Sequence, residues 1–169
     1  MKFEPVIKWS GSKRSQSEEI VKRIPNKQYD TYYEPFCGGC SVLFQLLHSD
    51  IQVNNYICSD INKGLIDLWN EIKNNPKNVA KSYEQMWNEL NVDDDKERKK
   101  QYFYKVRERY NTNHSPYDFM FIMRTTTNGM PRYNRNGEFN NSFHVTRNGI
   151  QPKKLEKTIH EWSELLNKH

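Results

Sequence analysis

Apolar positions along the first half of the chain alternate between the spacing of strands and that of helices. Residues 29–36, rich in tyrosine and phenylalanine, and the segment Val53–Cys58 have the composition and length of β-strands. Gly38 and Gly39 predict a turn, and the apolar residues after it recur at helical spacing; they are Val42, Leu43, Leu46 and Leu47. A second helix is predicted from Asp60 to Asn74, with one face formed by Ile61, Leu65, Leu68 and Ile72. This order of elements predicts an α/β chain with a Rossmann-type opening.

The second half of the chain is predicted to be mainly helical. Helical spacing recurs in three segments, which are residues 78–111, Pro116–Thr127 and the stretch after Pro152. The apolar face of the last helix comprises Leu155, Ile159, Trp162, Leu165 and Leu166. The charged run Asp93–Lys100 is expected to be a solvated loop or helix end. Near the N-terminus a short helix is expected over Ser15–Arg23, capped by Ser15 with Glu18 completing a capping box.

Residues 128–143, called here the hairpin segment, carry two Asn-Gly pairs. The pairs are Asn128-Gly129 and Asn136-Gly137, and aromatic residues surround the second one. Asn-Gly between aromatic residues is a strong signal for a β-hairpin, because both residues accept the positive φ that such turns require. We therefore expect the chain to reverse direction near Gly137.

The composition indicates one folded polar domain. A length of 169 residues suits a single domain. Ten Tyr, eight Phe and four Trp supply apolar surface for a core although 28% of the residues are charged. The sequence has no apolar run of membrane-spanning length and no apolar signal-peptide region, so we expect a cytoplasmic protein without a membrane.

Three cysteines argue against a disulfide framework and fit a reducing compartment. Cys37 and Cys40 form a C-x-x-C pair, which in the abstract is compatible with redox chemistry or zinc. Only Cys58 remains as another thiol ligand, and no histidine pair stands at zinc-finger spacing. The expectation is a protein without a metal site.

Positive charge is concentrated near the C-terminus. Between residues 124 and 154 there is one acid, Glu138, and six bases; the bases are Arg124, Arg132, Arg135, Arg147, Lys153 and Lys154. The segment therefore carries +5, as much as the whole chain. Bases interleaved with asparagine, threonine and aromatic residues are typical of a nucleic-acid surface, although a basic chain is also compatible with ordinary solubility.

The glycine turn and Asp60 together suggest a cofactor site. A glycine turn after a strand lets a ligand approach the backbone, and an acid at the end of the next strand can bind ribose hydroxyls. Asp60 stands at that position. A plain strand-to-helix turn is the alternative interpretation of this pattern.

Four ordered motifs resemble those of Dam-type (alpha class) adenine-N6 DNA methyltransferases. Residues 8–13 are similar to the family's Lys-Trp-x-Gly-Gly-Lys opening, and residues 34–39 to its S-adenosylmethionine (SAM) motif. Residues 60–66 resemble its Asp-x-Asn…Leu-Ile segment. Residues 128–140 resemble its DNA-reading hairpin. The resemblance covers nearly the whole chain but only the N-terminal portion of the family's pattern.

The resemblance implies two sets of site residues. The SAM pocket would be lined by Trp9, Lys13, Phe36, Gly38 and Asp60, with Lys13 suited to the methionyl carboxylate and Asp60 to the ribose. The surface for double-stranded DNA would comprise Asn128, Met130, Arg132, Arg135 and Arg147. Arg132 is suited to pair with guanine, with a phosphate contact or a solvated side chain as alternatives. For Trp9 the alternative is a core aromatic residue.

Three departures separate this chain from the family pattern. Ser12 and Cys40 stand where the family usually has glycine, and a side chain at position 40 is expected to crowd the cofactor. The family's Asp-Pro-Pro-Tyr motif, which binds the target amine and stacks on the flipped adenine, is not present, because all seven prolines are isolated.

Three interpretations follow from the missing motif. The chain is one piece of a methyltransferase, truncated or half of a split enzyme from a restriction-modification context, and catalytically incompetent alone. Alternatively it is a non-enzymatic DNA- or protein-binding regulatory protein, or its fold has closed differently and the SAM motifs are relics. We favour a partial Rossmann-like SAM-methyltransferase core over residues 1–75, followed by a helical and hairpin target-recognition segment over residues 76–169. Weak SAM binding is expected, and the open edge of an incomplete sheet predicts a second polypeptide or self-association.

Overall fold

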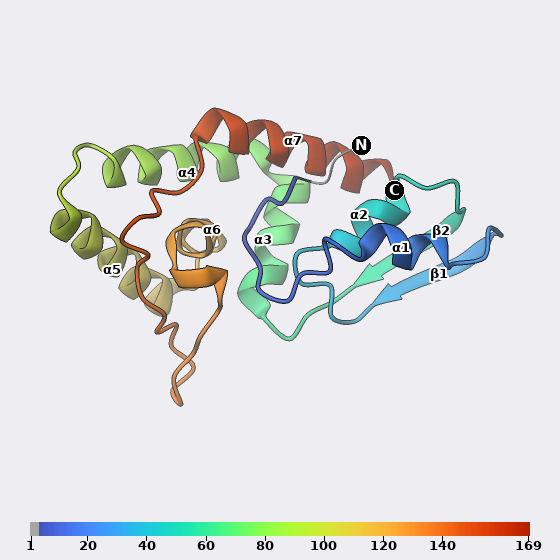
Figure 1. Ribbon diagram of the computed structural model, residues 1–169, viewed down its shortest axis with the longest axis horizontal. Coiled ribbons are helices and arrows are strands. Elements are labelled where there is room, and N and C mark those ends of the chain that lie inside the picture. The colour runs from blue at the N-terminus through green and yellow to red at the C-terminus, as the bar shows by residue number, and fades with distance from the viewer. Residues whose placement is uncertain (1–3) are drawn as a thin grey trace.

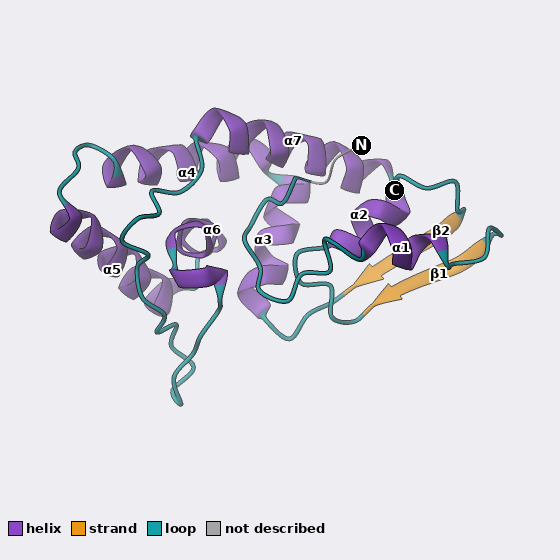
Figure 2. Ribbon diagram, viewed as in Figure 1, coloured by secondary structure: helices purple, strands orange, loops and turns teal. Residues whose placement is uncertain are grey.

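The computed structural model describes residues 4–169 and divides into a sheet end and a helical end (Figure 1). In chain order the elements are α1 (Ser17–Lys22), β1 (Tyr29–Glu34), α2 (Ser41–Leu47), β2 (Val53–Cys58), α3 (Lys63–Asn74), α4 (Pro76–Leu90), α5 (Lys96–Asn113), α6 (Pro116–Thr125), the 3-10 turn η1 (Thr127–Gly129) and α7 (Pro152–Lys168). Both strands lie at one end of the molecule, beside α1 and α2 (Figure 2).

The two strands form a parallel sheet joined by α2. Their register runs from Tyr29 opposite Val53 to Glu34 opposite Cys58. The backbone pairing continues past the strands, because the amide of Ser59 donates to the carbonyl of Glu34 at 3.0 Å and the amide of Cys37 donates to the carbonyl of Ser59 at 3.0 Å. The predicted strand, glycine turn, helix and strand are thus confirmed. Two strands alone do not make a complete Rossmann core.

The helical end is built around α6. The five residues 119–123 on this helix are fully buried, and a helix that is apolar on all sides must be surrounded by other elements. Helices α3, α4 and α5 contact it, and α7 packs across α3 and α4 (Figure 1). The core therefore runs without a break from the sheet to the far helices.

The last helix joins the two ends of the molecule. The ring of Trp162 on α7 lies 5.3 Å from that of Phe44 on α2 and 4.8 Å from that of Trp69 on α3, measured between centroids. The predicted apolar face of this helix is confirmed, since Leu155, Ile159 and Trp162 are buried. Within residues 4–169, no helix combines the length and the apolar character that a membrane span requires.

Several predicted boundaries were wrong. Helix α1 begins at Ser17 with Gln16 as its N-cap and no side-chain cap bond, so the Ser15–Glu18 capping box does not form. The helix expected from Asp60 begins at Lys63 because the side chain of Asn62 caps it, which leaves Ile61 outside the helix and 98% exposed.

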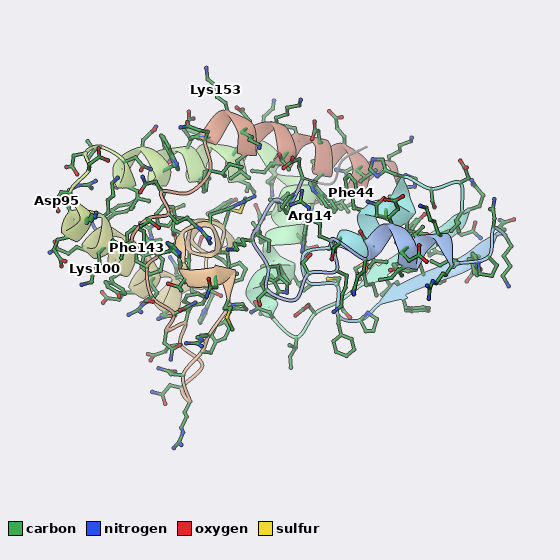
Figure 3. The ribbon with its side chains drawn as sticks, in the orientation of Figure 1. Arg14, Phe44, Asp95, Lys100, Phe143 and Lys153 are labelled. Atoms are coloured by element: carbon green, nitrogen blue, oxygen red, sulfur yellow. The ribbon has the colours of Figure 1, made fainter. Side chains whose placement is uncertain are left out.

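The segment 78–111 is helical as predicted, and its charged run separates two helices, α4 and α5. The carboxylate of Asp95 accepts hydrogen bonds from the amides of Glu97 and Arg98 and so starts α5 anew. Figure 3 places Asp95 and Lys100 at the end of the molecule away from the sheet. The charged run is thus a loop and helix start, as expected, but Lys99 within it is buried and pairs with Asp94.

The hairpin segment reverses direction where predicted but forms no regular strands. Its arms are joined by two isolated antiparallel bridges, Thr126 with Phe143 and Tyr133 with Phe139. Gly137 takes a φ of +80° at the turn. The segment extends away from the helical body (Figure 1), so few neighbours are available to complete a ladder.

Candidate functional site

The glycine turn after β1 is held from two sides. The amide of Gly38 donates to Oδ2 of Asp60 at 3.1 Å, and its carbonyl accepts from the indole of Trp69 at 3.0 Å. The other carboxylate oxygen of Asp60 accepts from the amide of Asn62 at 2.9 Å. The carboxyl ends of parallel strands meet at the same edge of a sheet. Asp60, which follows β2, therefore lies beside the glycine turn that follows β1, although the two are 22 residues apart in the sequence.

Trp9 packs directly on this turn. A β-carbon at Gly38 would lie 2.9 Å from Cδ1 and Nε1 of Trp9, and the φ of Gly38 is +49°. Only glycine can adopt this positive φ without strain and also leave the indole of Trp9 where it is. The indole is half-buried, so it packs on the core and still presents a surface at the turn.

The loop that carries Trp9 is tied to the start of α2 by a hydrogen bond between the hydroxyls of Ser12 and Ser41, 3.2 Å apart. This contact uses the side chain that Ser12 has in place of the family's glycine. Lys13 follows on the same loop with an exposed side chain. The loop therefore brings Trp9 to the turn and leaves the cation of Lys13 in solvent.

Exposed apolar side chains stand beside Asp60. Phe36 is 84% exposed and Ile61 98% exposed, although both belong to large apolar types. Each follows the end of a strand, so they flank the edge at which Gly38 and Asp60 meet. Sequence analysis selected Phe36 as a cofactor residue but assigned Ile61 to a helix face. The position of Ile61 next to Asp60 in the sequence was the signal for a role at this edge.

Below the edge, Glu34 lies on the covered face of the sheet. Its carboxylate accepts from the hydroxyl of Tyr32 at 2.9 Å. Burial raises the pKa of Glu34, and the hydrogen bonds from Tyr32 and from the backbone of Leu43 oppose that rise. Through its bond with Tyr32, Glu34 thus stabilises the end of β1 on the covered face of the sheet.

The three cysteines lie behind the turn. Cys37, Cys40 and Cys58 line a cavity of about 210 Å³ together with residues of α2, α3 and α7. Neither Trp9, Phe36 nor Asp60 contributes to that lining. Cys40 takes a left-handed φ of +53°, which explains why glycine suits this position, but its buried side chain faces the cavity.

The surroundings of Cys40 and Cys58 favour the protonated form of these two thiols. Hydrogen bonding with Cys37 and burial raise the pKa of Cys40, and burial raises the pKa of Cys58 to about 12. Across residues 4–169, no group of three or more metal-binding side chains is arranged to hold an ion.

Side-chain amides brace the hairpin segment. Asn141 donates to the carbonyls of Thr127 and Met130 at 3.0 and 2.9 Å. Asn111 on α5 donates to the carbonyl of Phe139 and accepts from its amide, at 3.1 and 2.8 Å. These bonds replace the missing ladder and fix the base of the segment.

The predicted DNA residues differ in exposure. Arg132 and Arg135 are exposed on the hairpin segment, and Asn128 is exposed with a left-handed φ of +58°. Met130 is half-buried. Arg147 is also half-buried, and its Nη1 is buried without a hydrogen-bond partner among residues 4–169.

The basic segment 124–154 does not form one surface. The guanidinium of Arg124 donates to the backbone carbonyls of Pro5 and Val6, and burial lowers its pKa to about 10. Lys153 projects from α7 on the side of the molecule opposite the tip of the hairpin segment (Figure 3). The charge count was right, but tertiary folding removes these two bases from any common surface.

The hairpin segment begins against the loop that carries Trp9. The amide of Ser10 donates to the carbonyl of Gly129 at 3.2 Å. A β-carbon at Gly129, whose φ is +61°, would lie 2.6 Å from the carbonyl oxygen of Lys8. The loop of Trp9 and the start of the hairpin segment, far apart in the sequence, therefore belong to one continuous region.

Comparison with known proteins places this arrangement in context. Residues 9–169 match the family described as D12 class N6 adenine-specific DNA methyltransferase. The Type II methyltransferase M.MjaIII of Methanocaldococcus jannaschii is 32% identical over an alignment of 151 residues, and the match covers 83% of this chain and 52% of that protein. The DNA adenine methylase of Haemophilus influenzae is 32% identical over 149 residues, 85% of this chain and 48% of that protein. The DNA adenine methylase of Serratia marcescens is 34% identical over 142 residues, 81% and 47% of the two chains. The chain spans about half the length of the curated relatives that it matches.

Proposed function

Because the chain belongs to the D12 class N6 adenine-specific DNA methyltransferase family, we propose that these residues hold SAM at the sheet edge and contact duplex DNA through the hairpin segment. Residues 1–75 carry the cofactor contacts and residues 76–169 the DNA contacts, within one packed unit. The family match lends no support to the alternative of a non-enzymatic regulatory protein.

The observation that carries the cofactor proposal is the hydrogen bond between Gly38 and Asp60. Each oxygen of Asp60 accepts one backbone N–H, and a carboxylate has about four acceptor positions, so it retains capacity for ribose hydroxyls. Phe36 and Ile61 offer exposed apolar surface for a purine ring. The cation of Lys13 suits the methionyl carboxylate. SAM, when bound, supplies the methyl group from its sulfonium.

The DNA proposal is supported by two exposed arginines on a protruding segment. Arg132 and Arg135 lie within the motif that resembles the family's reading hairpin. An arginine can donate two hydrogen bonds to guanine in the major groove, or it can contact phosphate. We propose that Arg132 reads a base and that Arg135 and Arg147 contact the backbone.

Methyl transfer itself requires polypeptide beyond the motifs found here. The exocyclic amine of adenine is a poor nucleophile, and the family's Asp-Pro-Pro-Tyr accepts hydrogen bonds from it. The 169 residues contain no Pro-Pro pair. We propose that they are inactive alone and that another segment, in the same or a second chain, supplies this motif.

The exposed face of the sheet supports such a partner segment. Tyr32, Tyr56 and Cys58 pack against the core, whereas the register partners Tyr33 and Ile57 on the other face are 66% and 50% exposed. Parallel sheets in folded proteins are usually covered on both faces. Further polypeptide on this face would also complete the wall of the cofactor site.

Calorimetric titration with SAM tests the proposal. We expect measurable but weak binding, and a loss of roughly ten- to hundredfold in Asp60→Asn, because hydrogen bonds to a charged acceptor contribute about 1.5–3 kcal/mol. Asparagine retains one oxygen that can accept from the amide of Gly38, so that bond to the turn should persist, whereas the bond from the amide of Asn62 is lost. Asp50→Ala, which removes an exposed carboxylate elsewhere, is the matched control.

Two results would contradict the proposal. One is unchanged SAM affinity in Asp60→Asn. The other is robust transfer of tritiated methyl groups to duplex DNA by the pure chain, which would show that Asp-Pro-Pro-Tyr is not needed.

A further inference from the structure

One side-chain hydrogen bond joins the hairpin segment to the loop after β2. The amide nitrogen Nδ2 of Asn62 donates to the hydroxyl of Tyr133 at 2.9 Å, across 71 positions of sequence. Tyr133 is 40% exposed, and its ring meets that of the buried Phe139 edge to face, 5.6 Å apart. The residue is therefore held by the polar contact with Asn62 and by packing on Phe139.

Asn62 connects this bond to the ribose acid. Its backbone amide donates to Oδ1 of Asp60 at 2.9 Å, and its side-chain oxygen accepts from the amide of Leu65 at 3.0 Å, which caps α3. Its backbone carbonyl also accepts from the amides of Leu65 and Ile66, at 3.1 and 3.2 Å, so all four polar groups of Asn62 are engaged. Asp60 and Tyr133 are therefore connected through the backbone amide and the side-chain amide of Asn62.

A second tyrosine completes the contact surface. The hydroxyl of Tyr110 on α5 lies over the first turn of α3, where a β-carbon at Gly64 would be 2.4 Å away. Burial and the neighbouring hydroxyl of Tyr133 raise the pKa of Tyr110. Between α3 and the hairpin segment lies a hollow of about 420 Å³ lined by Tyr110, Tyr133 and Gly137 among others. The segment is therefore not packed against α3 along its length, and the Asn62–Tyr133 bond spans its margin.

We propose that the Asn62–Tyr133 hydrogen bond couples cofactor binding to DNA recognition. The inference rests on the proposed function of Asp60 and the hairpin segment. Asn62 and Tyr133 are positioning residues, since each acts through its neighbours. Ribose hydroxyls bound to Asp60 restrain the loop, the loop holds Asn62, and Asn62 holds the arm of the hairpin segment that carries Arg132.

The coupling is reciprocal by thermodynamic necessity. If SAM raises the affinity for DNA by some factor, DNA raises the affinity for SAM by the same factor. Coupling factors of about 5 or more are typical when two sites share a structural element. Loss of one hydrogen bond between neutral groups is expected to reduce the factor roughly two- to tenfold.

The test measures SAM affinity by calorimetry with and without the duplex that binds this chain most tightly when selected from a pool of random sequences. The full 169-residue chain is compared with Tyr133→Phe, which deletes only the hydroxyl, and with Asn62→Ser, which keeps a helix cap but is too short to reach Tyr133. Tyr117→Phe is the matched control, because it removes another tyrosine hydroxyl that bonds across elements, to Glu71 at 2.6 Å. Hydrogen exchange of the amides of residues 132–140 provides a second readout.

We expect an affinity ratio of about fivefold or more in the wild type and in Tyr117→Phe, and a ratio within about twofold of unity in both test variants. SAM affinity without DNA should change less than about twofold, and SAM should slow exchange in the hairpin segment of the wild type and of Tyr117→Phe but not of the two test variants. Ratios equal to wild type in Tyr133→Phe overturn the coupling and leave the proposed function intact. A wild type that binds SAM and DNA independently has the same consequence, whereas a wild type without SAM binding overturns both proposals.

Discussion

At the scale of single residues, Gly38 is constrained by more contacts than any neighbour in the turn. Its amide bonds Asp60, its carbonyl bonds Trp69, its φ is positive, and the indole of Trp9 occupies the space that a side chain would need. Gly39 is different, because its φ is ordinary and a β-carbon there would meet Trp9 at a normal contact distance of 3.4 Å. Adjacent glycines thus differ sharply in how replaceable they are.

This difference predicts a clear loss of stability for one alanine substitution and almost no change for the other. Gly38→Ala should lower the free energy of unfolding by roughly 1–3 kcal/mol, from left-handed strain and displacement of Trp9. Gly39→Ala should stay within about 0.5 kcal/mol of wild type. Urea unfolding measures both, and equal losses in the two variants would show that the contact with Trp9 is not what restricts position 38.

At the scale of elements, the hairpin segment and α7 illustrate how one stretch of basic sequence is divided by folding. Arg132 stands on the protruding segment, whereas Lys153 projects from α7 on the other side of the molecule (Figure 3). Arg124 is used to bind the N-terminal segment through its backbone carbonyls. Net charge along the sequence is therefore a poor guide to charge on a surface.

DNA binding is expected to depend on Arg132 and not on Lys153. Arg132→Ala should weaken binding to the preferred duplex by roughly 1–3 kcal/mol and to random duplex by less, if it reads a base. Lys153→Ala, taken from the same basic stretch, should change affinity less than about twofold.

Fluorescence anisotropy at several salt concentrations measures these affinities. A loss in Arg132→Ala that is equal on all sequences and reduces the salt slope by about one would instead assign the residue to phosphate. Equal losses in both variants would mean that the DNA surface extends over α7.

At the scale of the whole molecule, the core depends on polar groups that are buried in their neutral forms. Burial raises the pKa of Cys58 from 9.0 to about 12, and that of Tyr83 from 10.0 to about 12. Cys58 lies at the sheet end, and the hydroxyl of Tyr83 on α4 bonds both the amide and the carbonyl of Ile150. Each group binds its proton more tightly in the folded chain than in the unfolded chain.

Stability should therefore decrease in alkali. The folded state retains protons that the unfolded state releases above about pH 9, so the free energy of unfolding should fall progressively between about pH 9 and 12. Urea unfolding at pH 7.5, 9, 10 and 11 measures the slope. Cys58→Ala should make that slope shallower, and a stability that is constant up to pH 11 would rule out this linkage.

The sequence by itself determined the elements and the family. Periodicity located the strands and most helices, since the spacing of apolar residues follows directly from backbone geometry. The motifs around Trp9, Gly38 and Asp60 pointed to the right family before any fold was known, because chemistry at a turn needs particular residue types in a fixed order. Boundaries failed where a local side-chain bond decided them, as when Asn62 rather than Asp60 began α3.

Only the tertiary structure decided which of these residues meet. It placed Asp60 against the amide of Gly38, bound Arg124 to the carbonyl of Val6, turned Cys40 toward the cavity behind the turn and left Ile61 exposed at the sheet edge. It also joined Asn62 to Tyr133 across 71 positions. Contacts of this kind form when the packing of elements brings distant side chains together. The spacing of residues along the sequence reflects only interactions between residues that are a few positions apart.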